Sequence, residues 1–255
     1  MKSSLERRDA VVAVLARQGQ TRVEDLADRF GVSTVTIRSD LNVLERSGHV
    51  VRRHGQALLS NLAAAELAFN ERRKLNMEAK ARIGVEAARR VKDGDTILLD
   101  AGTTTHQIAL NLKDRRELVV MTNGLDIAME LSHCPGIDII LLGGHLRKSA
   151  LSLSGSQAER SLREYRFDTL FLGVDGFDSQ IGITTFNERE ASLNRIMCEV
   201  ARQIVAVTDS SKFERGGHHL VCELRRLDVL VTDAGLPPAL RSTLAAQSHP
   251  HLVVV

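Results

Sequence analysis

Seven short apolar runs, separated by amphipathic stretches, are the feature that most constrains the fold of this 255-residue chain. The runs are Thr96–Leu99, Leu118–Met121, Ile137–Leu142, Thr169–Val174, Ile204–Val207, Val229–Val231 and Leu252–Val255. The amphipathic stretches are Thr105–Leu112, Leu125–Ser132, Ser156–Tyr165 and Glu190–Arg202. Short buried strands that alternate with helices are typical of βαβ units. We therefore expect an α/β fold, with a mainly parallel sheet covered by helices on both faces.

Polar and glycine residues follow most of these runs, at the edge of the sheet where open α/β folds bind ligands. In the segment Gly102–Thr105, the glycine permits close backbone approach, and three hydroxyls with the N–H groups of the next helix can hold a phosphate. Lys212 can add a positive charge. Carboxylates that can accept hydrogen bonds from sugar hydroxyls follow other runs, at Asp100, Asp175, Glu190 and Asp209. A helix cap, a surface lysine and loop-capping carboxylates are the respective alternatives.

The first sixty residues predict three short helices. The first spans Ser4–Arg17 and stops at Gly19, with Leu5, Val12 and Leu15 on its inner side. Thr21 is expected to cap the second helix, whose apolar face is Val23, Leu26, Ala27 and Phe30. After a turn at Gly31 and Val32, Ser33 is expected to cap a third helix that runs to about Ser47, with Ile37, Leu41 and Leu44 inward. This order is the helix-turn-helix pattern, and His49–Leu58 predict a two-stranded wing with a basic tip.

The charge distribution favours a nucleic-acid partner for this N-terminal part. Residues 1–60 carry ten Lys and Arg against seven Asp and Glu, a net charge of +3, whereas residues 61–255 carry 24 against 25, a net of −1. Recognition helices contact base edges with residues near their N-terminus. The candidate DNA-binding residues are Arg22, Ser33, Thr34, Thr36, Arg38, Ser39, Asn42, Arg52, Arg53 and His54. A solvated amphipathic helix is the alternative for the third helix taken alone.

Composition narrows the class of protein further. Aromatic residues make up 3% of the chain, which argues against a single-stranded nucleic-acid platform of stacked rings. The three cysteines are far apart and the nine histidines are scattered, so we expect no disulfide framework, no metal site and no cofactor. No apolar stretch is long enough to span a bilayer and the N-terminus lacks a signal-peptide pattern, so we expect a cytoplasmic protein without membrane contact.

Three regions are expected along the chain. Residues 1–60 form a winged helix-turn-helix, residues 61–80 form a linker helix or connection, and residues 81–255 form the effector domain. In the connection, Glu71, Arg72, Arg73 and Lys80 have the composition of a solvated helix face.

The run LADRFGVSTVTIRSDLNVLERSGHVVRRHGQALL resembles the DeoR family of bacterial regulators of sugar metabolism. The corresponding segment of that family commonly reads VS..TIRRDL..LE..G...R.HGGA. Ser39 stands where a second arginine is common, which bears on base preference. Gln56 replaces the second glycine of the HGG, which bears on the shape of the wing.

The resemblance continues in DGDTILLDAGTTT, VVMTNGLDIA, IILLGGHLR, FDTLFLGVDG and VTDSSKF. It implies an effector domain of the type found in ribose-5-phosphate isomerase and glucosamine-6-phosphate deaminase, with a phosphosugar held by the threonine segment. The residues expected to bind the effector are Lys80, Asp100, Gly102, Thr103, Thr104, Thr105, Asn123, Gly143, Gly144, Asp175, Glu190 and Lys212.

The motifs STVTIR, GGHLR and LNRIMCEVA are similar to a subgroup of this family that controls N-acetylgalactosamine catabolism. The resemblance implies a repressor of a sugar or amino-sugar operon that binds a double-stranded DNA operator as a homodimer or homotetramer. Its effector would be a phosphorylated sugar or amino sugar, such as N-acetylgalactosamine-6-phosphate or galactosamine-6-phosphate.

The alternative function is a sugar-phosphate isomerase or deaminase, motivated by the fold kinship and by Asp175 and Glu190. The chain lacks a DGADE-like acidic run, since Asp175-Gly176 is followed by Phe177-Asp178. An enzyme would also have no use for the first sixty residues. We therefore expect a regulator and no enzyme.

Overall fold

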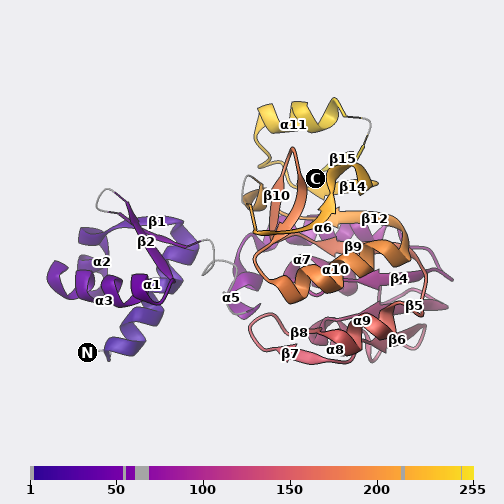
Figure 1. Ribbon diagram of the computed structural model, residues 1–255, viewed down its shortest axis with the longest axis horizontal. Helices are drawn as coiled ribbons and strands as arrows, with labels where there is room; N and C mark the ends of the chain where they lie inside the picture. The colour runs from indigo at the N-terminus through magenta and orange to yellow at the C-terminus, as the bar shows by residue number, and fades with distance from the viewer. Residues whose placement is uncertain (1–2, 54–55, 61–68, 214–215, 248) are drawn as a thin grey trace. The chain divides into compact units, whose positions relative to one another are not determined.

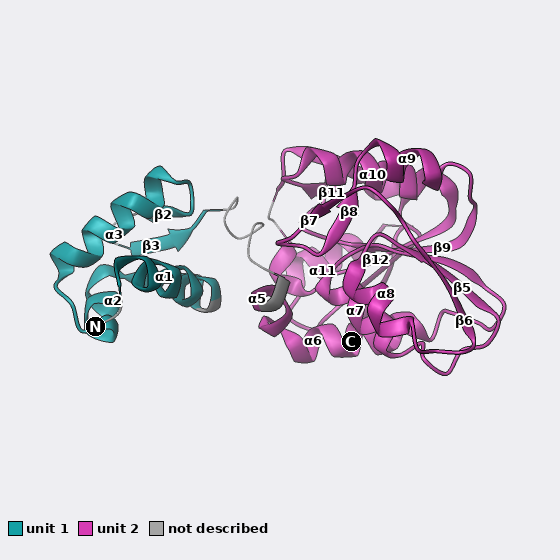
Figure 2. Cartoon of the chain, turned by 90° about the horizontal axis from the view of Figure 1, so that it is seen from below, with its two compact units in different colours: residues 1–67 teal, residues 68–255 magenta. Residues whose placement is uncertain are grey.

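The computed structural model describes residues 3–53, 56–60, 69–213, 216–247 and 249–255. The chain divides into two compact units, residues 1–67 and 68–255 (Figures 1 and 2). Of the linker helix or connection predicted at residues 61–80, residues 69–80 belong to the second unit, where residues 69–74 and 77–80 are helical. Residues 61–68 of that connection lie outside the described residues.

The first unit is a three-helix core with a small antiparallel sheet. Its elements are α1 (Ser4–Gln18), β1 (Gln20–Arg22), α2 (Val23–Phe30), α3 (Thr34–Arg46), β2 (Val50–Arg53) and β3 (Gln56–Leu59). Gly31 adopts a left-handed conformation at φ 63°, which ends α2 and lets its N–H bond to the carbonyl of Ala27. The side chains of Leu26, Ile37 and Leu41 are fully buried between the helices. The predicted helix-turn-helix and wing are therefore present.

Two expectations for the first unit are wrong. Thr21 does not cap α2, because it lies in β1, where its backbone pairs with Ala57 and its hydroxyl donates to the side-chain oxygen of Gln18 at 3.0 Å. Leu5 does not face inward but is 64% exposed, and Val11 takes the fully buried position instead. The third strand, β1, gives the sheet the order β1-β3-β2.

The second unit is built on a seven-stranded sheet in the order β15-β14-β12-β9-β4-β5-β6. The strands are β4 (Thr96–Leu99), β5 (Leu118–Thr122), β6 (Ile137–Leu141), β9 (Phe167–Gly173), β12 (Ala201–Val207), β14 (Val229–Thr232) and β15 (His251–Val254). Every neighbouring pair is parallel, so all seven carboxyl ends lie at one edge. The seven predicted strands and their parallel arrangement are confirmed. Chain order reverses between β4 and β9, which makes the gap between their ends the switch point of the fold.

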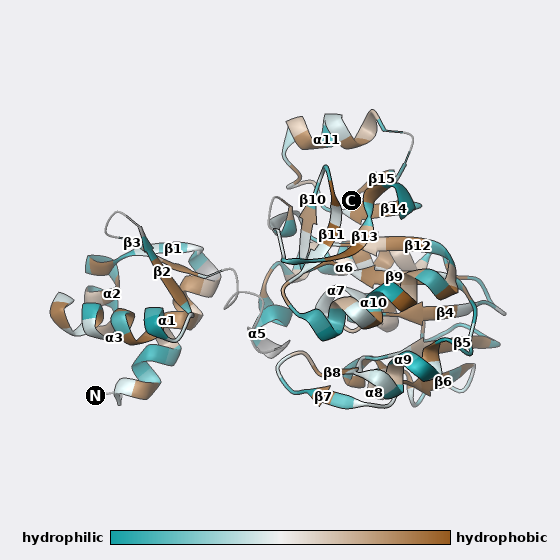
Figure 3. Cartoon of the chain, in the orientation of Figure 1, coloured by the Kyte–Doolittle hydropathy of each residue, from teal (hydrophilic) through white to brown (hydrophobic). Residues whose placement is uncertain are grey.

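Helices cover both faces of this sheet (Figure 2). The helices are α5 (Phe69–Lys74), α6 (Met77–Ala88), α7 (Thr103–Leu110), α8 (Leu125–Leu131), α9 (Ser156–Leu162), α10 (Glu188–Val200) and α11 (Pro238–Ala245). In β4, Leu98 packs in the core under α9 and α10, while Ile97 and Leu99 pack in the core under α6, α7 and α8. Figure 3 shows the corresponding hydrophobic colouring of the strands between the two helix layers.

Smaller elements follow the carboxyl ends of the strands β6, β9 and β12 along the chain. A hairpin joins β7 (His145–Arg147) to β8 (Ser152–Ser154), and a separate antiparallel sheet contains β10 (Gly176–Asp178), β11 (Gly182–Thr185) and β13 (His219–Glu223). Two short 3₁₀ helices lie at Ser210–Lys212 and Leu224–Arg226. The sequence did not predict these strands, because they lack long apolar runs. Among the helices of the described residues, none is long and apolar enough to cross a membrane.

Candidate DNA interface and effector site

The outward side of α3 carries a row of polar side chains. Ser33 caps this helix, since its hydroxyl accepts from the N–H of Thr36 at 3.1 Å, as the sequence predicts. Thr34, Arg38 and Asn42 follow one another at intervals of four residues and therefore share one side of the helix. The face they form with neighbouring residues, called here the outer face of α3, consists of Ser33, Thr34, Val35, Thr36, Arg38, Ser39 and Asn42.

Some residues on the outer face of α3 are exposed and others are half-buried. Arg38, Ser39 and Asn42 are exposed, while Thr34 and Thr36 are half-buried. Val35 is 72% exposed and was not among the sequence candidates. An apolar side chain in this position can contact the methyl group of a thymine in the major groove. The outer face of α3 thus offers hydrogen-bond donors, acceptors and one apolar contact.

A buried ion pair holds α3 against α1. The carboxylate of Asp40, 5% exposed, accepts from Arg7 Nε at 2.6 Å and from a second guanidinium nitrogen at 3.3 Å. This bidentate contact fixes the rotation of α3 about its axis. The sequence did not indicate it, because an acidic residue at position 40 looks like part of the solvated face.

The wing carries two of the predicted basic residues in the described part of the chain. Arg52 bonds to Glu45 of α3 through Nε at 3.0 Å and Nη2 at 2.5 Å, and this contact lowers the pKa of Glu45. The backbone of Arg53 pairs with that of Gln56 across the β2–β3 hairpin. His54 lies outside the described residues. Arg52 must therefore leave Glu45 before it can contact a phosphate with all its donors.

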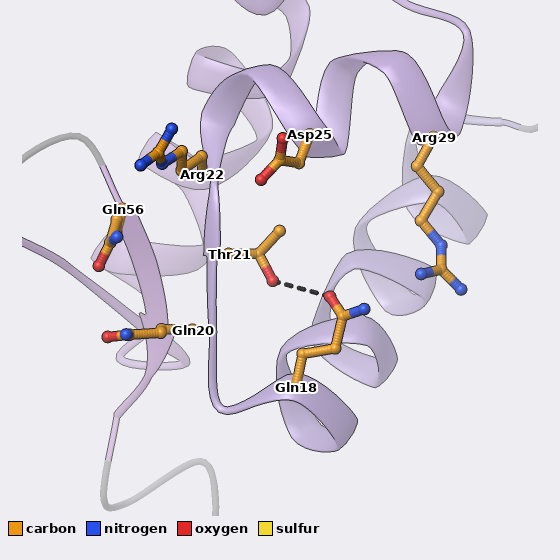
Figure 4. Close-up of a pocket in the computed structure, with 7 residues that line it drawn as sticks. All are labelled: Gln18, Gln20, Thr21, Arg22, Asp25, Arg29 and Gln56. Carbon is orange, nitrogen blue, oxygen red and sulfur yellow. Dashed lines mark hydrogen bonds between the residues drawn. The ribbon is translucent and has the colours of Figure 1, made fainter.

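A polar hollow of about 490 Å³ is lined by residues of β1, β3, α2 and the end of α1 (Figure 4). Its lining contains the predicted Arg22 together with Gln18, Gln20, Thr21, Asp25, Arg29 and Gln56. Arg22 is exposed and lies opposite Gln56 in the β1–β3 pairing. Gln56, the departure from the HGG motif, is thus beside a predicted phosphate-binding arginine.

The second candidate site lies at the carboxyl ends of β4 and β9. Asp100 directly follows β4, is 5% exposed, and accepts from the N–H of Gly173 at 3.2 Å and from Asn194 Nδ2 at 3.3 Å. Asn123 follows β5 and its side-chain oxygen accepts from the N–H of Ala101 at 2.7 Å. These bonds fix the loop that leads into α7.

The first turn of α7 has the features of an anion site. Gly102 precedes the helix, no acidic residue lies in its first turn, and Thr103 and Thr104 are half-buried. The first N–H groups of a helix have no partner within the helix and carry its positive dipole end. Thr105 is different, since its buried hydroxyl donates to the carbonyl of Gly102 at 2.9 Å. The hydroxyl of Thr105 therefore shapes the turn.

Three carboxyl groups lie next to this turn, and two of them, Asp100 and Glu190, have a raised pKa. Burial raises the pKa of Asp100 well above its usual value, and the charges of Glu190 and Asp175 raise it further. Burial and the charge of Asp175 also raise the pKa of Glu190, although Arg147 bonds to it at 2.7 Å. Asp175 accepts from the hydroxyl of Thr185 at 3.0 Å. The predicted Asp100, Asp175 and Glu190 are therefore brought together.

A positively charged group lies near the end of β12. Lys80 is 4% exposed and donates to the carbonyl of Arg72 at 2.7 Å. Burial lowers the pKa of Lys80 to about 8, against the attraction of Asp209, and the charges of Lys212 and Arg72 lower it further. Burial would raise the pKa of Asp209, but a Ser211 hydrogen bond and the charges of Lys212 and Lys80 together lower it. The expectation of a solvated face is wrong for Lys80.

Gly143 and Gly144 follow β6, and Gly144 has a structural reason to be glycine. Gly144 has φ 120°, and a Cβ there would lie 2.5 Å from the carbonyl oxygen of Ser154. The close approach of β8 explains Gly144 without a ligand. A Cβ on Gly143 would lie 2.9 Å from the side-chain nitrogen of Gln157, which can move aside.

Sequence reasoning missed two arginines beside the candidate effector site. The side chains of Arg147 and Arg72 are each 15% exposed, and they contact Glu190 and Asp175 respectively. Arg147 is the last residue of the motif GGHLR, and its positive charge within that motif could have identified it as a candidate binding residue. Arg72 lies in a stretch of alternating charges, and only tertiary packing distinguishes it from a surface residue.

These features define a class: a helix-turn-helix DNA-binding regulator joined to an α/β sensor unit. Residues 7–61 match the family described as DeoR-like helix-turn-helix domain, and residues 75–234 match the DeoR C terminal sensor domain. The chain belongs to the DeoR family of transcriptional regulators, as the sequence motifs predicted, and not to a family of enzymes.

Named relatives support this assignment along most of the chain. A protein of Escherichia coli O157:H7, named "Putative aga operon transcriptional repressor", is 43% identical over 234 residues, covering 91% of this chain and 87% of its own. The glycerol-3-phosphate regulon repressor of Escherichia coli K12 is 31% identical over 210 residues, covering 82% and 83%. Among solved structures, ribose 5-phosphate isomerase A of Methanocaldococcus jannaschii is similar over 55% of this chain and 56% of its own, with a TM-score of 0.42 and 20% identity.

Proposed function

We propose that this regulator represses a sugar or amino-sugar catabolic operon and that a sugar phosphate releases it from its operator. The single observation that supports binding of a sugar phosphate is the first turn of α7. This turn has the features of an anion site, contains no acidic residue, and lies beside the buried Lys80 and three carboxyl groups. A phosphate fits the helix turn, and hydroxyl or amino groups fit the carboxyls. A cytoplasmic location belongs to the same proposal.

In the DNA half of the proposal, the outer face of α3 contacts base edges in the major groove. Arg38 is suited to guanine because its guanidinium can donate two parallel hydrogen bonds, and Asn42 is suited to adenine. Arg22, Arg52, Arg53 and His54 would contact the phosphate backbone, while Ser33, Thr34, Thr36 and Ser39 complete the polar surface. A homodimer or homotetramer would place two such helices about one DNA turn apart, ~34–36 Å.

In the effector half, phosphate would bind to Gly102, Thr103 and Thr104 with Lys80 and Lys212 as counter-charges. Asp100, Asn123, Asp175 and Glu190 would bind the sugar, with Thr105, Gly143 and Gly144 shaping the walls of the site. The relative named for the aga operon supports an amino-sugar phosphate, such as N-acetylgalactosamine-6-phosphate or galactosamine-6-phosphate. A coupling free energy of ~1–3 kcal/mol would weaken operator binding roughly 5- to 150-fold.

A thermal-shift screen with phosphorylated sugars tests the effector half. A ligand that binds only the folded chain raises its unfolding temperature, by an amount that grows with concentration. The Lys212→Gln variant should lose most of this shift, whereas Lys92→Gln, which removes an exposed lysine of the same unit, should retain it. Absence of a shift with every sugar phosphate at millimolar concentration would contradict the proposal.

A further inference from the structure

Arg72 is a poorly paired, mostly buried cation beside Asp175 in the candidate effector site. Its Nη1 lies 3.8 Å from Asp175 Oδ1, and its Nη2 donates to the carbonyl of Ser149 at 3.5 Å. Its Nε is buried and has no acceptor among the described residues. The side chain as a whole is 15% exposed, but the Nε atom is buried, so bulk water does not replace the missing bond of that donor.

The lengths of these contacts distinguish Arg72 from Arg147 and Arg7, which pair closely with carboxylates. Arg147 reaches Glu190 at 2.7 Å and Arg7 reaches Asp40 at 2.6 Å, which are ordinary lengths for charged pairs. The contact from Arg72 to Asp175 is about 1 Å longer. A guanidinium has five N–H donors in one plane, and leaving a buried donor unpaired costs free energy. Arg72 is thus suited to accept a further anion.

The backbone around Arg72 is joined to the same site. Its carbonyl accepts from Lys80 at 2.7 Å, and Asn76, four residues later, donates to Asp209 at 2.8 Å. Along the chain, α5 begins at Phe69, directly after the boundary between the two units at residues 67 and 68. A ligand that binds Arg72 therefore also contacts α5, the first described helix of the second unit.

We propose that Arg72 is a ligand of the effector phosphate, which draws the guanidinium from Asp175 and thereby couples effector binding to α5, the first described helix of the sensor unit. This inference rests on the proposed function, since it assumes that a phosphate occupies the site. The bidentate fork of arginine matches two phosphate oxygens. Asp175, released from Arg72, keeps its bond to Thr185 and gains a free oxygen for a hydroxyl of the sugar.

Calorimetric titration of the full chain with galactosamine-6-phosphate and with inorganic phosphate tests this role. Arg72→Gln should weaken binding of both probes at least tenfold, and Arg72→Lys should restore part of the loss because it keeps the charge without the fork. Arg73→Gln is the matched control, since it removes the same charge from an exposed position on the same helix. Equal affinities for Arg72→Gln and the wild type would overturn the proposal.

Hydrogen exchange of the wild type gives a test that needs no variant. Saturation with either probe should slow exchange in peptides covering residues 69–76, and unchanged exchange there despite binding would contradict the role of Arg72. The two proposals fail differently. If the wild type binds no sugar phosphate at all, the proposed function fails and this inference with it, whereas binding that is indifferent to Arg72 refutes only the inference.

Discussion

Replacing Gly84 by alanine should destabilise the sensor unit, although the residue lies inside a helix. A Cβ at this position of α6 would lie 2.6 Å from the Cβ of Gln107 and 2.7 Å from its carbonyl carbon and oxygen. Contacts of this length with the backbone of α7 force the two helices apart. The higher helix propensity of alanine stabilises the variant by about 1 kcal/mol. Overpacking destabilises it by about 1–3 kcal/mol, and we expect a value near the upper end of this range because the new Cβ collides with backbone atoms.

The expected net loss is about 1–2 kcal/mol, which lowers the unfolding temperature of a unit of this size by roughly 2–8 °C. The only tyrosine of the chain, Tyr165, lies in the second unit and there is no tryptophan, so intrinsic fluorescence follows that unit alone. Val85→Ala, at a 40% exposed position of the same helix, is the control and should change little. An unchanged or raised unfolding temperature for Gly84→Ala would refute the close packing of α6 on α7.

Further predictions concern DNA and effector binding. Arg38→Ala should abolish most operator specificity while leaving the tyrosine-monitored unfolding of the second unit unchanged. The control variant Arg46→Ala, in the last turn of α3, should keep its specificity. Equal loss of specificity in both variants would contradict the assignment of the outer face of α3. Glu45→Gln should strengthen DNA binding and steepen its salt dependence, because Arg52 no longer has to leave a carboxylate; weaker binding in a salt titration would count against this. Effector affinity should fall as the pH rises past about 8, where Lys80 loses its proton, and a flat profile between pH 7 and 9 would exclude Lys80 from the site. The same low pKa means that the unfolded chain binds more protons between pH 8 and 10.5, so Lys80 makes the sensor unit more stable as the pH rises through that range.

The elements that could be predicted from the sequence are those formed by consecutive buried apolar residues. The strand Thr96–Leu99 was located to the residue, because a run of apolar side chains buried on both faces leaves a clear signal. The strand Gln20–Arg22 was missed because its three residues are polar, and its pairing with β3 comes from tertiary structure. For the same reason Thr21 was mistaken for a helix cap.

The candidate effector site was predictable where its residues follow a strand directly. Asp100, Asn123 and Asp175 lie at ends of adjacent strands, so the parallel topology alone brings them to one edge. Arg72 was assigned to a solvated face, and Lys80 was placed in the site only by the family resemblance, because local sequence does not distinguish a charged residue on an exposed surface from one packed over a sheet edge. Their burial depends on helices α5 and α6 folding against β12 and α7, which local periodicity does not encode.

Release from DNA by a sugar phosphate tests the central claim most directly. The measurement is fluorescence anisotropy of a labelled operator duplex, selected by the full chain from a random library, titrated with protein at fixed salt in the presence of each sugar phosphate. At least one amino-sugar or sugar phosphate should weaken operator binding roughly 5- to 150-fold, and the unphosphorylated sugar should not. Operator affinity that stays unchanged with every sugar phosphate, or the same weakening by the unphosphorylated sugar, would contradict the account.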